Sequence, residues 1–174
     1  MPYIDARAKP QIQRPASNTF ILLSLLAALF LNWLPWGGIW LLMRPDFVAI
    51  VLLYWCMHKP WRIGIGISWA MGILADVSDA SLFGQHALAY TILAFGGLVL
   101  HRRLRMFDLR QQTVQVFGIL VLTYAVYMLV QWQVNGYMVW LYLLGSLTST
   151  LLWAPLNLMF QAMQQKRVER DGRP

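Results

Sequence analysis

Charged residues are scarce in this sequence. Of its 174 residues, 59% are hydrophobic and 12% are charged, whereas a soluble domain contains about 25% charged residues. No charged residue occurs at positions 15–43 or at positions 111–165. A water-soluble fold of this size needs a more polar surface than that. The composition therefore excludes a soluble enzyme and a disordered chain, and it predicts an integral membrane protein.

Cysteine and acidic residues are also few. The single cysteine, Cys56, has no partner for an internal disulfide, and it lies in an apolar run where cysteine behaves as a small hydrophobe. Fourteen basic residues outnumber seven acidic ones. The basic residues form short clusters between apolar runs, which is typical of cytoplasmic loops of membrane proteins and argues against nucleic-acid binding. Such clusters attract anionic lipid headgroups.

Apolar runs of helical length divide the chain. A bilayer core about 30 Å thick requires roughly 20 helical residues. Dividing the sequence at charges, prolines and glycines predicts an all-α polytopic membrane protein with six transmembrane helices, over about residues 19–34, 45–57, 61–75, 86–100, 113–134 and 139–164. An alternative joins the first two runs into one helix and gives five spans. The Pro-Trp-Gly-Gly sequence at 35–38 and the proline at 45 favour six.

The distribution of basic residues predicts the orientation. With the N-terminus in the cytoplasm, six spans place 13 of the 14 basic residues on the cytoplasmic side and leave Arg44 outside. The acidic residues Asp46, Asp76 and Asp79 fall on the outside with it. The sequence thus predicts a basic cytoplasmic segment at 1–18, one six-helix membrane domain at 19–164 and a basic cytoplasmic tail at 165–174.

Two carboxylates are expected within or at the edge of the membrane. Asp46 and Asp76 lie at similar distances along their helices from the turn around Pro60, so they should reach similar depths. A charged group costs about 2.5–3.5 kcal/mol at the bilayer centre, so both should face protein or water. Arg44 is the one outer cation, and we expect it to pair with Asp76 or Asp46. For Asp46 a helix-capping role is an alternative to a functional site, and for Asp76 internal scaffolding is an alternative to partner contact.

Small residues recur at helical spacing in two of the expected spans. In the third span they repeat every four residues and end at Asp76, so they share one helix face that permits close approach of a neighbour. That pattern directs Asp76 into the bundle. A second set lies at 145–157 in the last span. The candidate helix-packing positions, for a partner helix or an internal neighbour, are Gly64, Ser68, Gly72, Gly145 and Ser149.

Catalytic signals are weak. The three histidines lie at span ends without the spacing of metal ligands, and no serine nucleophile motif or phosphate-binding glycine loop occurs. Asp46 and Asp76 could form an aspartyl dyad, but Arg44 would hold both ionised, whereas a dyad shares a proton. We therefore predict no catalytic, metal-binding or cofactor-binding residue and a protein that is not an enzyme.

One stretch of the chain resembles a known family. The sequence RPDFVAIVLLYW at 44–55 resembles the second-helix signature of the rod shape-determining protein family MreD. The sequences GILAD at 72–76 and LFGQHAL at 82–88 continue the resemblance, which covers about a quarter of the chain. The matched positions are Arg44, Pro45, Asp46, Gly72, Asp76 and Gly84. The family pattern also accepts an amide at position 46.

The resemblance implies a non-catalytic component of the bacterial cell-elongation machinery in the inner membrane. Proteins of this family associate with the bitopic protein MreC. Through it they associate with MreB and with the RodA–penicillin-binding-protein synthase of the lateral wall. The implied fold is similar to the S-components of energy-coupling-factor transporters. The alternative function is therefore small-molecule or lipid binding and transport of the S-component type, with Arg44, Asp46 and Asp76 lining a cavity.

Overall fold

The computed structural model describes residues 17–35, 37–38, 43–79, 83–106, 108–136 and 140–171. Within these ranges the chain is helical and contains no strand. The elements are α1 (Asn18–Asn32), α3 (Phe47–His58), α4 (Ile65–Ser78), α5 (Gln85–Met106), α6 (Leu109–Asn135), the short 3-10 helix η1 (Trp140–Leu143) and α7 (Leu144–Asp171). Positions 36, 39–42 and 80–82 of the expected outer loops lie outside the described residues.

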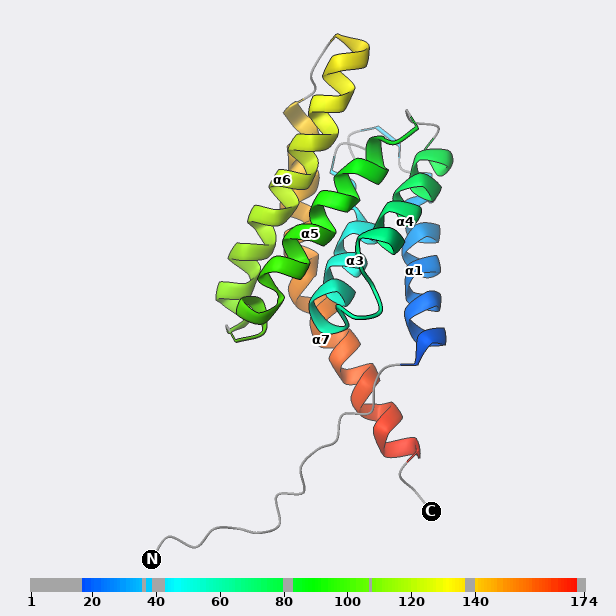
Figure 1. Cartoon of the computed structure of the whole chain (residues 1–174), viewed down its shortest axis with the longest axis vertical. Helices are drawn as coiled ribbons and strands as arrows, with labels where there is room; N and C mark the ends of the chain where they lie inside the picture. The colour runs from blue at the N-terminus through cyan, green and yellow to red at the C-terminus, as the bar shows by residue number, and fades with distance from the viewer. Residues whose placement is uncertain are drawn as a thin grey trace, which may run out of the picture.

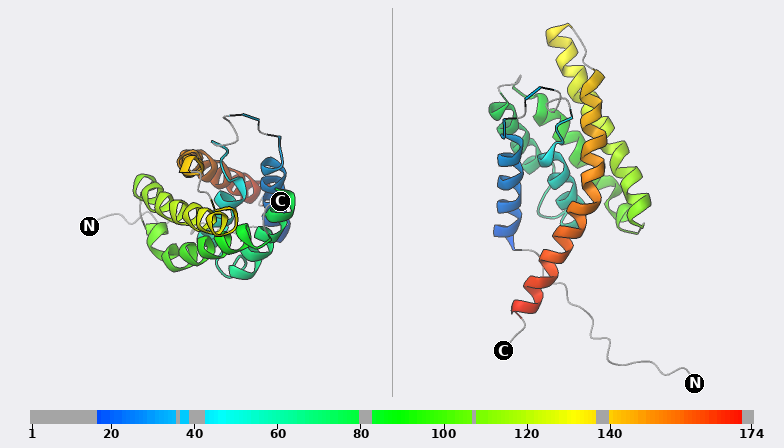
Figure 2. Two further views of the ribbon diagram at one scale, coloured as in Figure 1. Left: turned by 90° about the horizontal axis from the view of Figure 1, so that it is seen from above. Right: turned by 180° about the vertical axis from the view of Figure 1, so that it is seen from behind.

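Successive helices run in alternating directions, so α1 begins and α7 finishes at the same end of the bundle (Figure 1). Helix α5 packs against α3, α4 and α6, and α6 packs against α7. Helix α3 contacts α1, α5 and α7, and it lies among them when the bundle is viewed from above or behind (Figure 2). The fold is thus a helical bundle arranged around α3.

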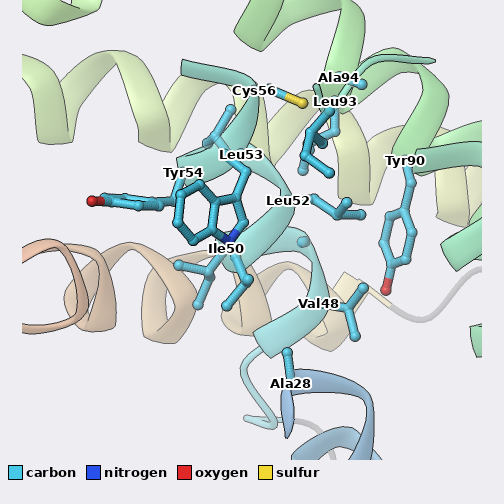
Figure 3. Packing of buried hydrophobic residues seen from close by; sticks show 14 of the residues in the cluster. Ala28, Val48, Ile50, Leu52, Leu53, Tyr54, Cys56, Tyr90, Leu93 and Ala94 are labelled. Atoms are coloured by element: carbon cyan, nitrogen blue, oxygen red, sulfur yellow. The ribbon is translucent and has the colours of Figure 1, made fainter. Parts of the chain in front are cut away.

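Helix α3 is central because it is apolar on every side. All ten residues from Val48 to Met57 are buried, as expected for a helix without a polar face. Figure 3 shows its side chains pointing in several directions, with Tyr54 and Leu52 on opposite sides. Trp55 is fully buried, and its Nε1 donates to Ser24 Oγ at 2.9 Å. Because lipid is as apolar as these side chains, close packing holds α3 in place.

Local signals explain where the helices begin and end. The Asp46 carboxylate caps α3 by accepting from the Ala49 N–H at 3.0 Å. Helix α6 ends at Gly136, whose φ of 70° is left-handed and favours glycine. Because α1 ends at Asn32 and α3 begins at Phe47, the alternative of one joined helix is wrong. The third expected helix begins later than position 61, since Trp61 lies in a turn and is 98% exposed.

The helices differ in length. Leu109–Val134 and Trp140–Gln164 are long and apolar enough to cross a membrane, whereas Asn18–Asn32, Phe47–His58 and Ile65–Ser78 are apolar but shorter. At about 1.5 Å per residue, α3 extends about 18 Å, well below the thickness of a bilayer core. Polar groups at the ends of the short helices are therefore brought toward the interior of the bundle.

Candidate functional site

Polar side chains gather where α1 and α4 end and where α3 and α5 begin, which we call the polar end. They come from segments far apart in the sequence: Asn32, Arg44, Asp46, Asp76, Asp79, His86 and Tyr90. Asp76 and Asn32 are almost completely buried. The hydrogen bonds among these groups show how their burial is compensated.

Asp76 is enclosed by the connection between α4 and α5. Its side chain accepts from the backbone N–H groups of Gly84 and His86, both at 2.8 Å. The His86 ring lies against the same carboxylate, with Nδ1 2.9 Å from Oδ1. Gly84 has φ of 97°, a conformation that favours glycine and lets its N–H point back at the carboxylate. Two backbone donors and a histidine therefore compensate the burial of Asp76.

The small-residue face of α4 allows this arrangement, because it lets α4 lie close to the start of α5. A Cβ on Gly72 would lie 2.3 Å from Ala87 Cα, so glycine is required for α4 to approach the start of α5 this closely. Ser68 is fully buried, with its Oγ 3.9 Å from Cys56 Sγ. Gly64 is the N-cap of α4, where an added Cβ would meet nothing within 4 Å. Only the middle of the expected face is therefore a close contact.

Asp46 connects helices instead of closing a turn. Its Oδ1 accepts from Asn32 Nδ2 at 3.0 Å as well as from the Ala49 N–H. The Tyr90 hydroxyl of α5 lies 2.9 Å from Oδ1 and 2.8 Å from Oδ2. The Asp46 N–H donates to Ser149 Oγ of α7 at 3.0 Å. One residue thus joins α1, α3, α5 and α7.

Arg44 pairs with Asp79. Its Nη2 lies 2.5 Å from Asp79 Oδ2, its Nη1 lies 3.3 Å from Oδ1, and Nη1 also donates to the Asn32 carbonyl at 3.1 Å. The expected pairing of Arg44 with Asp76 or Asp46 is therefore wrong. Burial lowers the pKa of the guanidinium, but the hydrogen bond and charge of Asp79 outweigh this and raise its pKa above the usual value. Asp76 is compensated by backbone donors and His86 instead.

The small residues of α7 also face the interior. Ser149 is fully buried and accepts from the Asp46 N–H, and its Oγ lies 3.5 Å from the Tyr124 hydroxyl. A Cβ on Gly145 would lie 2.7 Å from the same hydroxyl. The close-contact positions on α4 and α7 are thus occupied by other helices of this chain, so they serve internal packing.

A cavity of about 250 Å³ opens among these groups. Arg44, Asp46, Asp79 and His86 contribute to its wall, whereas Asp76 contacts His86 without lining the cavity. The remaining wall is rich in tyrosine, with side chains from α5, α6 and η1: Tyr90, Tyr124, Tyr127 and Tyr142. Within the described ranges, no three His, Cys, Asp or Glu side chains are grouped so that they could hold a metal ion.

Comparison with known proteins identifies the family of this chain. Residues 13–163 match the family described as rod shape-determining protein MreD. The chain belongs to the MreD family. The rod shape-determining protein MreD of Haemophilus influenzae is 29% identical over 153 residues, which cover 84% of this chain and 92% of that protein. No solved structure matches the chain.

Membership of the MreD family, together with the apolar helices, indicates a membrane protein of the shape-determining machinery. The sequence signature at 44–55 and 72–88 led to the same family, so that resemblance is confirmed. In the structure these two stretches meet at the polar end, where Arg44 of the first pairs with Asp79 of the second.

Sequence reasoning missed three groups of the site. His86 and Tyr90 are one turn apart on α5, so they share a face, and each contacts one of the two carboxylates. Asn32, at the last position of α1, was read as part of an apolar run. An amide in an apolar run shortly before a Pro-Trp-Gly-Gly sequence, and a His-x-x-x-Tyr spacing at the start of a helix, were the available signals.

Proposed function

We propose that this MreD-family chain is a non-catalytic scaffold of the cell-elongation machinery in the bacterial inner membrane. It maintains rod shape by binding the transmembrane helix of MreC. Through MreC it helps organise MreB and the RodA–penicillin-binding-protein synthase for lateral peptidoglycan synthesis. The observation that carries this proposal is the family match over residues 13–163.

The proposed topology has six spans with both termini in the cytoplasm. Two structural observations support it: the helices alternate in direction, and α1 begins at the end of the bundle where α7 finishes (Figure 1). The clusters of basic residues at 1–18 and 165–174 of the sequence support it as well. In this topology the residues at 1–18 and 165–174 are cytoplasmic, and the polar end lies on the outer side. The S-component-like fold that the family resemblance implies is part of the same proposal.

The proposed mechanism is positional. Asp46 and Asp76 hold the ends of the short helices together, which gives the outer surface a fixed shape. Because Gly72 and Gly145 pack against Ala87 and Tyr124, we place the MreC helix on an outward face. Helix α7 offers one with exposed leucines at helical spacing, at Leu147, Leu151 and Leu158.

Site-specific photo-crosslinking tests this proposal. A photo-reactive residue is placed at Leu151 of α7, at Leu122 of α6 or at Phe30 of α1, all of which are exposed. Position 149, which is buried, serves as the matched control on α7. We expect MreC to crosslink from Leu151 and not from position 149. Absence of MreC from every crosslink and from the co-purified material would refute the scaffold function.

The alternative of an S-component-like carrier is favoured by one observation, the polar cavity of about 250 Å³. Mass spectrometry of the purified protein separates the two functions. A single metabolite retained in stoichiometric amount would favour the carrier. Bulk phospholipid together with retained MreC would favour the scaffold.

A further inference from the structure

The cavity at the polar end has the size of a small polar group. Its volume is about 250 Å³. Pockets for drug-sized ligands are larger, at about 300–1,000 Å³. A lipid headgroup or a small metabolite therefore suits the size of the cavity.

The charges that line the cavity do not balance. Arg44 is engaged by Asp79 through both Nη atoms, so these two charges compensate each other. The His86 ring lies beside Asp76 and Asp79. Among the described residues, no basic group lies within ion-pair distance of Asp46. The cavity therefore keeps the negative charge of Asp46.

Asp46 also has hydrogen-bonding capacity left. Its Oδ1 accepts from the Ala49 N–H, from Asn32 and from Tyr90, whereas its Oδ2 accepts from Tyr90 alone. A carboxylate oxygen has two lone-pair sites. An additional N–H donor in the cavity would thus complete the set around Oδ2.

The aromatic wall favours the same kind of ligand. Tyr124, Tyr127 and Tyr142 line the cavity together with Tyr90, and the Tyr127 and Tyr142 rings pack edge to face with centroids 6.1 Å apart. A cation close to tyrosine rings is attracted by their negative faces, by about 0.5–2 kcal/mol. Tyrosine hydroxyls also accept hydrogen bonds.

We propose that this cavity binds a primary ammonium group, with Asp46 as its counter-ion and the tyrosines around it. A hydrogen-bonding ammonium suits the free acceptor of Asp46 better than a quaternary one. An anion is disfavoured because the carboxylates of Asp46 and Asp79 both line the cavity. The ammonium group belongs to a soluble amine or to the headgroup of an ethanolamine lipid. This site goes beyond the scaffold function and does not require transport.

The variant Asp46→Asn tests the counter-ion. Asparagine caps helices about as well as aspartate, so the start of α3 is preserved while the charge is removed. The matched control is Asp108→Asn. Asp108 is the exposed N-cap of α6, and its side chain makes no capping hydrogen bond.

Isothermal titration calorimetry on the purified full chain in detergent measures the binding. The probes are ethanolamine, putrescine and short-chain phosphatidylethanolamine, with phosphatidylcholine, phosphatidylglycerol and inorganic phosphate for comparison. We expect an amine probe to bind and the anions not to bind. Asp46→Asn should weaken binding at least tenfold, and Asp108→Asn should leave it unchanged. Binding of free ethanolamine identifies a soluble amine as sufficient, and binding of the lipid alone identifies the headgroup.

Three results would overturn the proposal: no binding of any amine, equal affinity in folded Asp46→Asn, or preferential binding of phosphate or phosphatidylglycerol. Co-purification of MreC, measured on the same preparations, keeps this outcome separate from the scaffold function. Retained MreC without amine binding refutes the ammonium site alone. Lost MreC with intact amine binding refutes the scaffold alone.

Discussion

Two carboxylates at the same end of the bundle are stabilised in different ways. Asp76 is 1% exposed, and its neighbours are the backbone of the α4–α5 connection and the adjacent His86 ring. Asp46 is half-buried, receives side-chain hydrogen bonds from two other helices, and lines a cavity. The two carboxylates therefore differ in access: Asp76 is enclosed by the turn that binds it, whereas Asp46 lies at a junction of separate helices that leaves it in contact with a cavity.

The largest effect is expected from disturbing the closed region through its glycine. In Gly72→Ala the new Cβ would lie 2.3 Å from Ala87 Cα, a backbone atom that cannot rotate away. Helices α4 and α5 must separate, so we expect a loss of at least about 3 kcal/mol, at the upper end of overpacking costs. Thermal unfolding in detergent measures the change. Gly66→Ala, where a Cβ meets nothing within 4 Å, is the control and should be neutral or slightly stabilising.

The next largest effect is expected from Asp76→Asn. The amide NH₂ replaces an acceptor that faces backbone N–H donors of Gly84 or His86. Hydrogen bonds to a charged group contribute about 1.5–3 kcal/mol each, so we expect a loss of about 2 kcal/mol. The same unfolding measurement applies. A variant as stable as the wild type would show that the turn is not held by the carboxylate.

A smaller effect is expected from the same substitution at Asp46. Asparagine keeps an acceptor for the Ala49 N–H and for Asn32, and it preserves the cap of α3. We expect a loss below about 1 kcal/mol. The comparison with Asp76→Asn is therefore direct, because one chemical change is made in two surroundings. A greater loss of stability from Asp46→Asn than from Asp76→Asn would contradict the distinction between an enclosed Asp76 and an open Asp46.

The smallest effect is expected at the Arg44–Asp79 pair. Its side chains are 21% and 20% exposed, and partly exposed ion pairs contribute about 0–1 kcal/mol. A double-mutant cycle with Arg44→Gln and Asp79→Asn measures the coupling. We expect about 0.5–1 kcal/mol, decreasing as salt screens the charges. A coupling that is larger and independent of salt would mean that the pair is sealed from solvent.

The helices themselves could be predicted, because their limits depend on local signals. Apolar runs, the Asp46 cap and the turn at Gly136 placed most boundaries within a few residues. The four-residue repeat ending at Asp76 predicted an inward carboxylate, and Asp76 is buried. Periodicity is a property of one helix, so no knowledge of its neighbours was needed.

Partner choice could not be predicted. Three carboxylates were expected on the outer side with Arg44, and the sequence reasoning considered only those of Asp46 and Asp76 as its partners. The choice of Asp79 depends on how α5 crosses α4, because that crossing presents His86 and the Gly84 N–H to Asp76 and leaves Asp79 beside Arg44. Likewise, Gly145 and Ser149 suggested a helix contact but not that Tyr124 and Asp46 provide it.

By itself, the sequence determined that the chain is helical and apolar, that it has the MreD signature, and that a few charges stand apart at one end. These properties follow from composition and from spacing along a single helix. Only the tertiary structure decided which carboxylate is closed by backbone donors and which one lines a cavity with tyrosines. The reason is physical: hydrogen-bond partners of buried charges are set by contacts between helices that are distant in sequence, and small differences in helix approach decide them.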